Sequence, residues 1–566
     1  MANKQKVQGS DALLLSLIAE QTDIIFGYPG GQVIPIYDRL YDYSDRIRHI
    51  LTRHEQGAVH AAQGYARVTG KVGVCMATSG PGATNLVTGI ADAMLDSTPL
   101  VCITGQVPAA LLGTDAFQEA DMISMTMPVT KWNYQVTSAS EIAPAIARAF
   151  YIARSGRPGP VVIDIAKNAQ VEECEFAYRP CLSLRSYTPN PVVDKDAVSK
   201  AVEMINASER PLVLVGQGVK LSGAEQELLE FAEIGNLPVG QTLMGISTVP
   251  NNHPLFVGNL GMHGNIPANS MTQKADLIIA LGLRFSDRIT GNVAKYAPEA
   301  KIIHVDIDKA ELGKNVRVDL PIHANLKDAI EMLKAGLKYE QRQPWFDFAD
   351  EKKQQELDEV IVPGRADDKP YITMARVMQD LATEVKGEAI VVTDVGQNQM
   401  FSALYSKFNN SRSFVTSGGL GTMGFGLPAA MGAKLGAENK QVVAVMGDGG
   451  FQMSMQELGT IMQNKIGVKM LILNNSFLGM VRQWQQLFFD RRYSFTTLEN
   501  PDFSKVAAAY NIPTKRVVEK KDLEGAIKEM LAAEGSYLLE VCVENEENVF
   551  PMVPAGASLS ESIYKA

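Results

Sequence analysis

Cysteine is scarce in this sequence, and long hydrophobic runs are missing. Five cysteines stand among 566 residues, and no pair has the Cys-x-x-Cys spacing of many metal sites. We therefore predict reduced, mostly buried thiols at Cys75, Cys102, Cys174, Cys181 and Cys542. No apolar run approaches membrane-spanning length, and the polar N-terminus has no signal-peptide core, so we predict a cytoplasmic protein.

Clusters of basic residues are also missing. The formal net charge is −10, and no segment gathers enough Lys and Arg to release counterions from a phosphate backbone. Nucleic acid is therefore not an expected partner. The composition, 46% hydrophobic and 20% charged, is that of an ordinary globular protein, and the length favours about three or four domains, of which three fits the pattern along the chain best.

Apolar runs alternate with glycine-containing turns and helix-like stretches along the whole chain. This alternation indicates an α/β fold with open parallel sheets covered on both faces. The strand-like runs lie in IIFGYPGG, VGVCMATSGPGATN, LVCITGQ, PVVIDIA, PLVLVGQGV, ADLIIALGLRF, KIIHVDID, AIVVTDVGQ, QVVAVMGDGG and KMLILNN. The predicted domains and tail are 1–180, 196–340, 370–550 and 551–566, with separating stretches at 180–195 and 339–370.

Polar residues close two neighbouring runs in the last of these domains. Asp448 follows one apolar run, and Asn474 and Asn475 follow the next. Strand ends of an open parallel sheet face the ligand crevice, so the two groups can converge there. A hard divalent cation prefers oxygen ligands, which makes Asp448 and Asn475 candidate metal ligands. A plain Gly-Asp-Gly turn is the alternative interpretation.

Glycines surround the candidate aspartate. Gly447, Gly449 and Gly450 permit close approach of the backbone to a diphosphate. A helix starting near Phe451 would point its N-terminus at that charge. The Gly-Asp-Gly motif and the following Asn-Asn pair resemble, in spacing and strand context, those of thiamine diphosphate-dependent enzymes. The resemblance implies that Mg²⁺ is held by Asp448, Asn475 and the backbone oxygen of Phe477.

Glu55 opens an alanine-rich predicted helix in RHEQGAVHAAQGYARVTG. A carboxylate there could reach, from one domain, a cofactor anchored in another and share a proton with it. Alone, it would be read as an ordinary acid stabilised at a helix N-terminus. The HEQGA and GYAR segments resemble the same family, which implies that Glu55 activates the cofactor through its pyrimidine ring.

The glycine-rich segment SGGLGTMGFGLPAA contains Met423. A methionine is more often simple core, but the GTMG match implies that Met423 wedges the two cofactor rings into a bent form. The remaining residues expected to contact thiamine diphosphate are Pro29, Gly30, Gly82, Asn85, Gln397, Asn398, Gly421 and Met480.

Further segments, in one order along the chain, resemble those of acetohydroxyacid (acetolactate) synthases: FGYPGG, TSGPGATN, GTDAFQE, GMHG and LGMVRQWQQLFF. The resemblance implies decarboxylation of pyruvate and carboligation of the hydroxyethyl unit to pyruvate or 2-oxobutyrate. The products would be 2-acetolactate or 2-aceto-2-hydroxybutyrate, in branched-chain amino acid biosynthesis. A catabolic acetolactate synthase, a pyruvate oxidase or a glyoxylate carboligase is the alternative, and a non-catalytic nucleotide-binding protein is a more distant one.

Residues outside the cofactor motifs suggest how substrates are held. Phe117 would offer an apolar wall to the methyl group of pyruvate, and Gln118 a hydrogen bond to the cofactor. Arg284 or Arg288 would bind the acceptor carboxylate, and the resemblance points to Arg284. Trp484 would crowd the acceptor's alkyl chain. The catalytic candidates are Glu55, Phe117, Gln118, Lys167, Arg284 and Trp484.

The middle section resembles the flavin-binding domain of the same family, which implies a structural FAD. The candidate contacts are Arg157, Gly216, Met262, His263, Gly264, Arg284, Arg288, Asp306 and Ile307. Three sites depart from the family pattern: Ala324 and Asn325 replace Gly-Asp, Ala166, Lys167 and Asn168 replace Pro-Lys-Asp, and Gln32 replaces a small residue. The resemblance also implies a homodimer or homotetramer and a small regulatory subunit.

Overall fold

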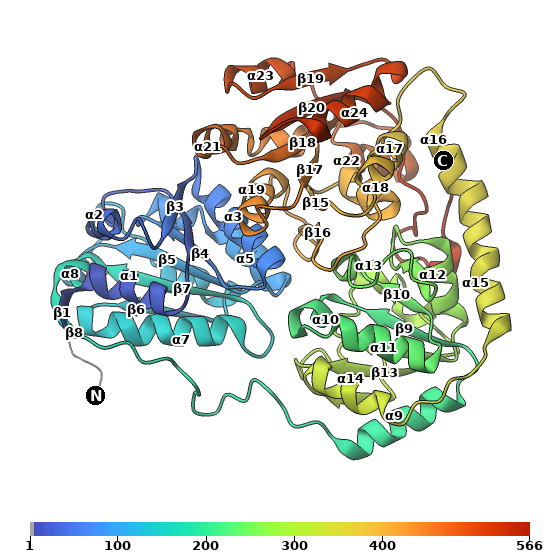
Figure 1. Ribbon diagram of the computed structural model, residues 1–566, viewed down its shortest axis with the longest axis horizontal. Helices are drawn as coiled ribbons and strands as arrows, with labels where there is room; N and C mark the ends of the chain where they lie inside the picture. Colours follow the sequence, from blue (N-terminus) through green and yellow to red (C-terminus); the bar gives the residue numbers. More distant parts are fainter. Residues whose placement is uncertain (1–4, 566) are drawn as a thin grey trace.

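The structure is a computed structural model that describes residues 5–565, and it contains three lobes, each built on a six-stranded sheet (Figure 1). All pairs within the three large sheets are parallel. The predicted class, three open parallel-sheet α/β domains, is confirmed. No helix in the described part of the chain is long and apolar enough to cross a membrane.

The N-terminal lobe has a central sheet with helices on its faces (Figure 1). Its strands, in sheet order, are β3 (Arg48–Leu51), β2 (Ile24–Gly27), β4 (Gly73–Ala77), β5 (Leu100–Gln106), β7 (Pro160–Ala166) and β6 (Trp132–Val136). Its helices are α1 (Gly9–Ala19), α2 (Ile34–Asp42), α3 (Glu55–Thr69), α4 (Pro81–Thr84), α5 (Val87–Leu95), α6 (Met122–Thr126), α7 (Ile142–Arg154) and α8 (Lys167–Val171). An antiparallel pair, β1 (Gln5–Gln8) with β8 (Glu173–Phe176), lies beside them.

The middle lobe repeats this arrangement. Its strands, in sheet order, are β11 (Phe256–Asn259), β10 (Val239–Gln241), β9 (Pro211–Val215), β12 (Leu277–Leu281), β13 (Lys301–Asp306) and β14 (Leu320–His323). Its helices are α9 (Lys195–Ala207), α10 (Gln217–Ser222), α11 (Glu225–Gly235), α12 (Ile266–Lys274), α13 (Asp287–Thr290) and α14 (Leu326–Lys334).

The C-terminal lobe carries the third sheet. Its strands, in sheet order, are β16 (Phe414–Val415), β15 (Ile390–Thr393), β17 (Val442–Gly447), β18 (Val468–Asn474), β20 (Tyr537–Cys542) and β19 (Thr514–Val517). Its helices are α17 (Met374–Val385), α18 (Gln397–Tyr405), α19 (Gly426–Gly436), α20 (Asp448–Gln452), α21 (Leu458–Asn464), α22 (Gly479–Phe488), α23 (Phe503–Ala509) and α24 (Leu523–Ala532).

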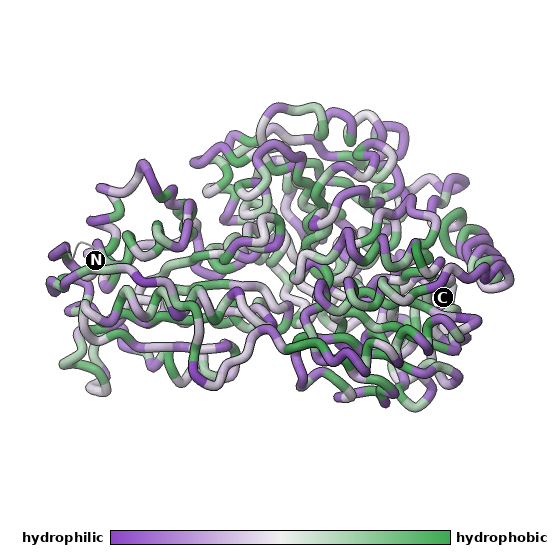
Figure 2. Tube along the Cα trace, turned by 60° about the horizontal axis from the view of Figure 1, so that its bottom comes forward, coloured by the Kyte–Doolittle hydropathy of each residue, from purple (hydrophilic) through white to green (hydrophobic). Residues whose placement is uncertain are grey.

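The two connections between lobes differ. Residues 177–194 form neither helix nor strand and cross from the N-terminal to the middle lobe (Figure 1). The polar stretch expected at 339–370 is mostly helical: α15 (Gln343–Glu356), a π-helical turn (Leu357–Ile361) and α16 (Val362–Arg365). Figure 2 shows this arm as largely hydrophilic. It is nevertheless anchored, because Trp345 is buried and its Nε1 donates to the Pro211 oxygen at 2.9 Å.

The cysteines are free, as expected, but they are less buried than predicted. Cys75 and Cys102 are buried on β4 and β5. The other three, Cys174, Cys181 and Cys542, are partly exposed because they lie at edge or end positions of short elements or in the connection between lobes.

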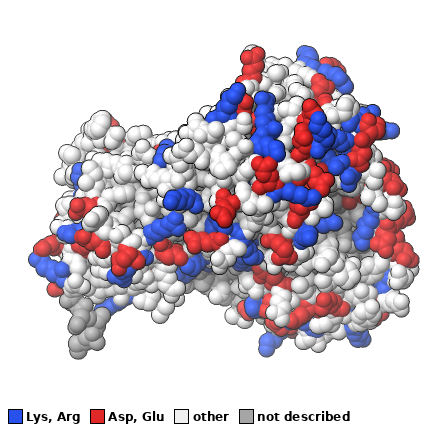
Figure 3. Space-filling view, turned by 45° about the horizontal axis from the view of Figure 1, so that its top comes forward, with Lys and Arg blue, Asp and Glu red and all other residues white. Residues whose placement is uncertain are grey.

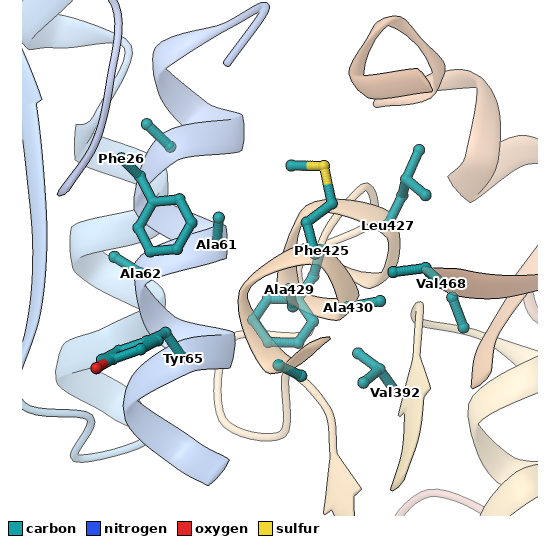
Figure 4. Close-up of a cluster of buried hydrophobic side chains, with 14 of the residues drawn as sticks. Phe26, Ala61, Ala62, Tyr65, Val392, Phe425, Leu427, Ala429, Ala430 and Val468 are labelled. Atoms are coloured by element: carbon teal, nitrogen blue, oxygen red, sulfur yellow. The ribbon is translucent and has the colours of Figure 1, made fainter. Parts of the chain in front are cut away.

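The N-terminal and C-terminal lobes meet through α3 and α19, which share one buried apolar cluster (Figure 4). A Cβ added at Gly64 would lie 1.9 Å from the Ala429 oxygen, and one at Gly432 would lie 1.8 Å from the Ala61 oxygen. The helices can approach this closely only because glycine has no side chain at these two positions. Phe425 packs just before α19, and its ring contacts the buried His60 of α3 at 5.2 Å between centroids.

Replacing Gly432 by alanine tests this contact. Gly432→Ala should lower the free energy of unfolding by about 1–3 kcal/mol, because the new methyl group must push two backbones apart. The shift of the urea and thermal unfolding midpoints measures the effect. Gly525→Ala in α24 is the matched control, because nothing lies within 4 Å of its Cβ position. The control should be neutral or stabilising by about 0.5–1 kcal/mol. Equal midpoints for the two variants would contradict the proposed close approach.

Candidate active site

Most candidate residues lie beyond or near the carboxyl end of a parallel strand, where ligands of open α/β sheets bind; Arg157, which precedes β7, is an exception. In the C-terminal lobe the register pairs Gly447 of β17 with Leu473 of β18. Asp448, which follows β17, and Asn474, the last residue of β18, therefore lie at neighbouring strand ends. This adjacency is what the sequence spacing led us to expect of the two polar groups.

Asn500 joins these strand ends. Its Nδ2 donates to Asp448 Oδ2 at 2.7 Å and to Asn474 Oδ1 at 2.9 Å. Asp448 is 1% exposed, and burial raises the pKa of its carboxyl to about 6. No cation of the described chain forms an ion pair with Asp448, so a metal ion would supply the missing positive charge.

Asn475 is oriented by a second amide. Its Nδ2 donates to Gln397 Oε1 at 3.2 Å, and its Oδ1 accepts from the Phe477 nitrogen at 3.2 Å. Gln397 in turn donates to the Glu547 oxygen at 2.7 Å. A Cβ at Gly479 would lie 2.1 Å from Gln397 Oε1, so glycine is required where α22 begins.

The loop that carries Met423 is held by Asp394, a fully buried carboxylate after β15. Asp394 accepts from the nitrogens of Gly424 and Gly426 at distances from 2.9 to 3.1 Å. Burial raises the pKa of Asp394, and these backbone donors oppose that effect. Met423 is half-buried, and its Cε lies 3.6 Å from the Cβ position of Gly449.

The glycines around Asp448 differ in how much they are needed. A Cβ at Gly450 would lie 2.3 Å from Asp394 Oδ1, and one at Gly449 would lie 2.9 Å from Leu478 Cδ2. Gly447 has no such neighbour within 3.4 Å. The helix expected near Phe451 in fact begins at Asp448, because β17 passes directly into α20 at this point.

Gln397 and Asn398 open α18, behind the positive-φ residue Gly396. Their side chains already bind inside the protein: Asn398 Nδ2 donates to the Val445 oxygen at 2.9 Å. What α18 offers a phosphate is its first backbone N–H groups, which have no partner within the helix. Gly421, in the loop between β16 and α19, also has positive φ.

In the N-terminal lobe, Glu55 is the first residue of α3 and is half-buried. Its Oε2 accepts from Asn85 Nδ2 at 3.0 Å, and its Oε1 lies 3.1 Å from the Cβ position of Gly82. The preceding loop is fixed by the C-terminal lobe, because Glu457 accepts from the Arg53 nitrogen at 3.0 Å. Burial raises the pKa of Glu457 to about 7.

The other N-terminal candidates surround the ends of β2, β5 and β7. Gly30, which follows Pro29, approaches Thr78 so closely that a Cβ would lie 2.5 Å from its methyl group. Lys167 donates to the Gly31 oxygen at 3.2 Å. Phe117 and Gln118 lie on the loop after β5, and Phe117 is 84% exposed.

Ala166 and Asn168, which depart from the family pattern beside Lys167, fit into the fold without a clash. Ala166 ends β7, and Asn168 Oδ1 accepts from the Ala109 nitrogen at 2.8 Å. Gln32 Oε1 is buried without a partner among the described residues.

A cavity of about 890 Å³ lies among the three lobes, large enough for a cofactor. Of the flavin candidates all but Gly264 line it: Arg157, Gly216, Met262, His263, Arg284, Arg288, Asp306 and Ile307. Gly421, Met480 and Trp484 line it too, so this cavity extends to the C-terminal lobe. Met480 and Trp484 are four residues apart on α22 and therefore share a helix face.

Several ionisable groups line this cavity, and burial or ion pairing changes their charge state. Burial raises the pKa of Asp306 to about 6 and lowers the pKa of His263 to about 4. Arg157 is paired with Asp308 and Glu311, at 3.1 and 3.0 Å. Gly264 instead forms the tight turn behind Met262, where a Cβ would lie 2.6 Å from the Asn259 oxygen.

Asn325, one of the departures from the family pattern, also lines the cavity. Its side chain caps α14 by accepting from the Lys327 nitrogen at 3.0 Å. Ala324 is fully buried beside it. At these two positions the cavity is therefore lined by the Asn325 amide, which can offer a flavin a polar contact.

The structure brings most of the flavin candidates together with Gly421, Met480 and Trp484 in the large cavity, which Asp448, Asn475 and Met423 do not line. Glu55, Phe117, Gln118 and Lys167 neither line the large cavity nor form a hydrogen bond or ion pair with Asp448 or Asn475. Sequence reasoning missed three positioning residues: Asp394, Glu457 and Asn500. Of these only Asp394 had a sequence signal, as a polar residue closing an apolar run.

Comparison with known proteins defines the class. Three family models of thiamine pyrophosphate enzymes match the chain. The N-terminal TPP-binding domain matches residues 7–125, the central domain matches 198–333, and the C-terminal TPP-binding domain matches 394–541. Thiamine pyrophosphate is another name for thiamine diphosphate. The fold and these matches place the chain among the enzymes that use this cofactor.

Full-length relatives narrow the class. The probable acetolactate synthase large subunit of Methanocaldococcus jannaschii is 46% identical over 98% of this chain and 95% of its own length. The acetolactate synthase large subunit of Corynebacterium glutamicum is 44% identical over 100% and 91%, respectively. The acetolactate synthase isozyme 2 large subunit of Escherichia coli is 43% identical over 99% and 100%. The chain belongs to the acetolactate synthase large-subunit family of thiamine pyrophosphate enzymes.

Asn500→Ala tests the bridge between the two strand ends. Loss of both hydrogen bonds should weaken Mg²⁺-dependent binding of thiamine diphosphate by about 10–100-fold, because ligand orientation depends on such outer partners. Calorimetric titration of the cofactor measures this. Asn410→Ala, which removes a surface contact with Glu388, is the control and should bind normally. Unchanged affinity in Asn500→Ala would show that the bridge does not orient the metal ligands.

Proposed function

We propose that this protein is an acetohydroxyacid synthase. It decarboxylates pyruvate and joins the hydroxyethyl unit to pyruvate or 2-oxobutyrate, giving 2-acetolactate or 2-aceto-2-hydroxybutyrate for branched-chain amino acid synthesis. One observation carries the proposal: Asn500 joins the buried Asp448 carboxylate to Asn474 at adjacent strand ends, in a chain whose large cavity is lined by the flavin candidates.

The donor set fits Mg²⁺-bound thiamine diphosphate. Asp448, Asn475 and the Phe477 backbone oxygen would hold the metal ion, and the start of α18 would face the diphosphate. When bound, thiamine diphosphate supplies a nucleophilic carbon that adds to the carbonyl group of a 2-oxo acid. FAD fits the cavity among the three lobes and would be structural, because the net reaction transfers no electrons.

The protein's own residues would position the cofactor and the substrates and would exchange protons with the cofactor. Glu55 would share a proton with the cofactor pyrimidine through one carboxyl oxygen, while Asn85 donates to the other oxygen. Met423 would hold the cofactor in its bent form, and the Asp394 contacts fix the loop that carries it. Arg284 binds the acceptor carboxylate through its planar fork of donors.

A second copy of the chain would complete the site. Glu55, Phe117 and Gln118 of one protomer would face the metal site of its partner, in a homodimer or a dimer of dimers. The N-terminal lobe supports this because it exposes large apolar side chains: Tyr28, Ile34, Tyr41, Leu111, Phe117, Met125 and Met127. In Figure 3 this lobe, on the left, shows a wide area without charged side chains.

The family of large subunits supports a further partner, a small regulatory subunit. The relatives are named as large subunits, and a large subunit implies a smaller one. A cytoplasmic location stays a prediction from the sequence.

Glu55→Gln tests the proposed activator. The amide keeps the hydrogen-bonding shape but cannot share a proton, so kcat should fall by about 10²–10⁴-fold while cofactor affinity stays nearly unchanged. Steady-state rates and cofactor titration separate the two effects. Glu524→Gln, at an exposed position in the first turn of α24, is the control. Near-normal turnover in Glu55→Gln would rule out this role.

The products test the reaction itself. Pyruvate mixed with 2-oxobutyrate should give both acetohydroxy acids by mass spectrometry. Acetate would instead indicate a pyruvate oxidase, and tartronate semialdehyde from glyoxylate would indicate a glyoxylate carboligase. No release of CO₂ with Mg²⁺ and thiamine diphosphate would indicate a non-catalytic protein.

Trp484→Leu tests acceptor selection. Trp484 lines the large cavity, and its ring lies 5.2 Å from that of Phe488. A smaller side chain should reduce any preference for 2-oxobutyrate over pyruvate by up to about 1–3 kcal/mol, the range for one methylene group. The product ratio in a competition assay measures it. An unchanged ratio would remove Trp484 from the acceptor site.

A further inference from the structure

A second, smaller cavity lies where the three lobes meet. Its volume is about 90 Å³. Four cationic residues line it, Arg67 and Arg154 of the N-terminal lobe, Lys220 of the middle lobe and Arg412 of the C-terminal lobe, and no Asp or Glu within residues 5–565 does. The cavity therefore concentrates positive charge at a junction.

Lys220 carries a buried amine without a carboxylate partner. It is 8% exposed, and Nζ donates to the Ile246 oxygen at 2.9 Å, which uses one of its three donors. No carboxylate in the described chain lies within ion-pair distance of it. Burial, together with repulsion from Arg412 and Arg67, lowers the pKa of Lys220 to about 7. Buried charges in proteins are usually paired, so this one is unusual.

Two other donors in the same cavity wall are buried without a partner. Arg67 Nε and Thr98 Oγ1 make no hydrogen bond with any described residue. The Arg67 side chain is 7% exposed and Thr98 is fully buried. The guanidinium group of Arg67 is held in place, because Nη2 donates to Asp96 at 2.8 Å. An unsatisfied buried donor is costly, so three unmet donors around one cavity point to a ligand that accepts hydrogen bonds.

Arg412 closes the cavity from the third lobe. Its guanidinium donates to the backbone oxygens of Lys220 and Arg67 and lies 3.9 Å from Glu225. Arg154, at the rim, is paired with Glu20. The positive charge that remains uncompensated is therefore centred on Lys220.

We propose that this cavity binds a small inorganic oxyanion of the phosphate or sulfate type, held by Lys220, Arg67 and Thr98. Cofactor pockets have volumes of about 300–1,000 Å³, so a whole nucleotide does not fit, whereas a tetrahedral oxyanion does. Its oxygens can accept from all three donors at once, and charge-assisted hydrogen bonds of this kind are strong.

The position of the anion gives it a consequence for the fold. Lys220 lies on α10, Arg67 on α3, and Thr98 just before β5, so one ligand would tie the middle lobe to the N-terminal lobe. Arg67 also binds Asp96, which accepts from the nitrogens of Gly418 and Gly419 in the loop leading to Met423. Anion binding should therefore stabilise the assembly of lobes.

Sulfate is the probe of choice, because it does not titrate near neutral pH. Full-length protein should show a saturable rise in thermal unfolding midpoint, and a calorimetric binding isotherm, with sulfate at constant ionic strength. Lys220→Met should weaken binding at least about tenfold, the loss of a charge-assisted hydrogen bond. Lys469→Met is the matched control, since Lys469 is also buried and bonded to backbone oxygens, those of Ala533 and Gly535. It should bind sulfate normally.

A second variant keeps the test decisive if Lys220→Met folds poorly. Thr98→Val preserves shape and charge and removes one donor, so it should also weaken sulfate binding. Equal binding by wild type and both variants, or no saturable response, would overturn the proposal. Phosphate and sulfate should bind alike to FAD-loaded and FAD-free protein. Displacement of sulfate by FAD would place a cofactor phosphate in the cavity and would equally overturn a separate anion site.

Discussion

The backbone contact between α3 and α19 is the constraint on which the proposed site depends. Gly64 and Gly432 let the two helices touch at backbone distance, and this fixes the helix that begins with Glu55 against the C-terminal lobe. Glu457 adds a polar tie to the loop before that helix, through the Arg53 nitrogen. The acid that would activate the cofactor is thus carried on a rigid element, as a proton-sharing group requires.

Buried carboxylates without cations characterise the C-terminal lobe. Asp394 and Asp448 are compensated by backbone N–H groups and an amide, and burial still raises the pKa of both. A bound divalent cation would reverse that effect at Asp448, so the apo lobe is prepared for a metal. Where the three lobes meet, the cavity around Lys220 is instead lined by basic side chains.

The sequence predicted most of the strands that lie inside the three large sheets, but it missed β10 and β20. The apolar runs LVCITGQ and PVVIDIA became β5 and β7 with the same bounds. The strands it missed are mostly sheet edges: β3, β6, β11, β14, β16 and β19. An edge strand faces solvent on one side and needs no continuous apolar run, so periodicity does not reveal it. The polar arm α15 was missed as a helix for a similar reason, since it buries only a few side chains such as Trp345.

The candidate site could be predicted where its residues share a segment of sequence, as Asp448 does with its glycines. Asn500 and Glu457 could not, because each acts on a residue that is distant in sequence and their contacts exist only after folding. No sequence pattern shows whether Glu55 acts on a cofactor bound by the same chain or by a second copy, because every chain contains both halves of the site.

Complementation between two inactive variants tests the shared site most directly. Glu55→Gln chains and Asp448→Ala chains, each inactive alone, should recover about a quarter of wild-type activity when unfolded and refolded together, because half of the dimers are mixed and each holds one intact site. No recovery above the separate variants, with mixed dimers demonstrated by native mass spectrometry, would contradict a site shared between two chains.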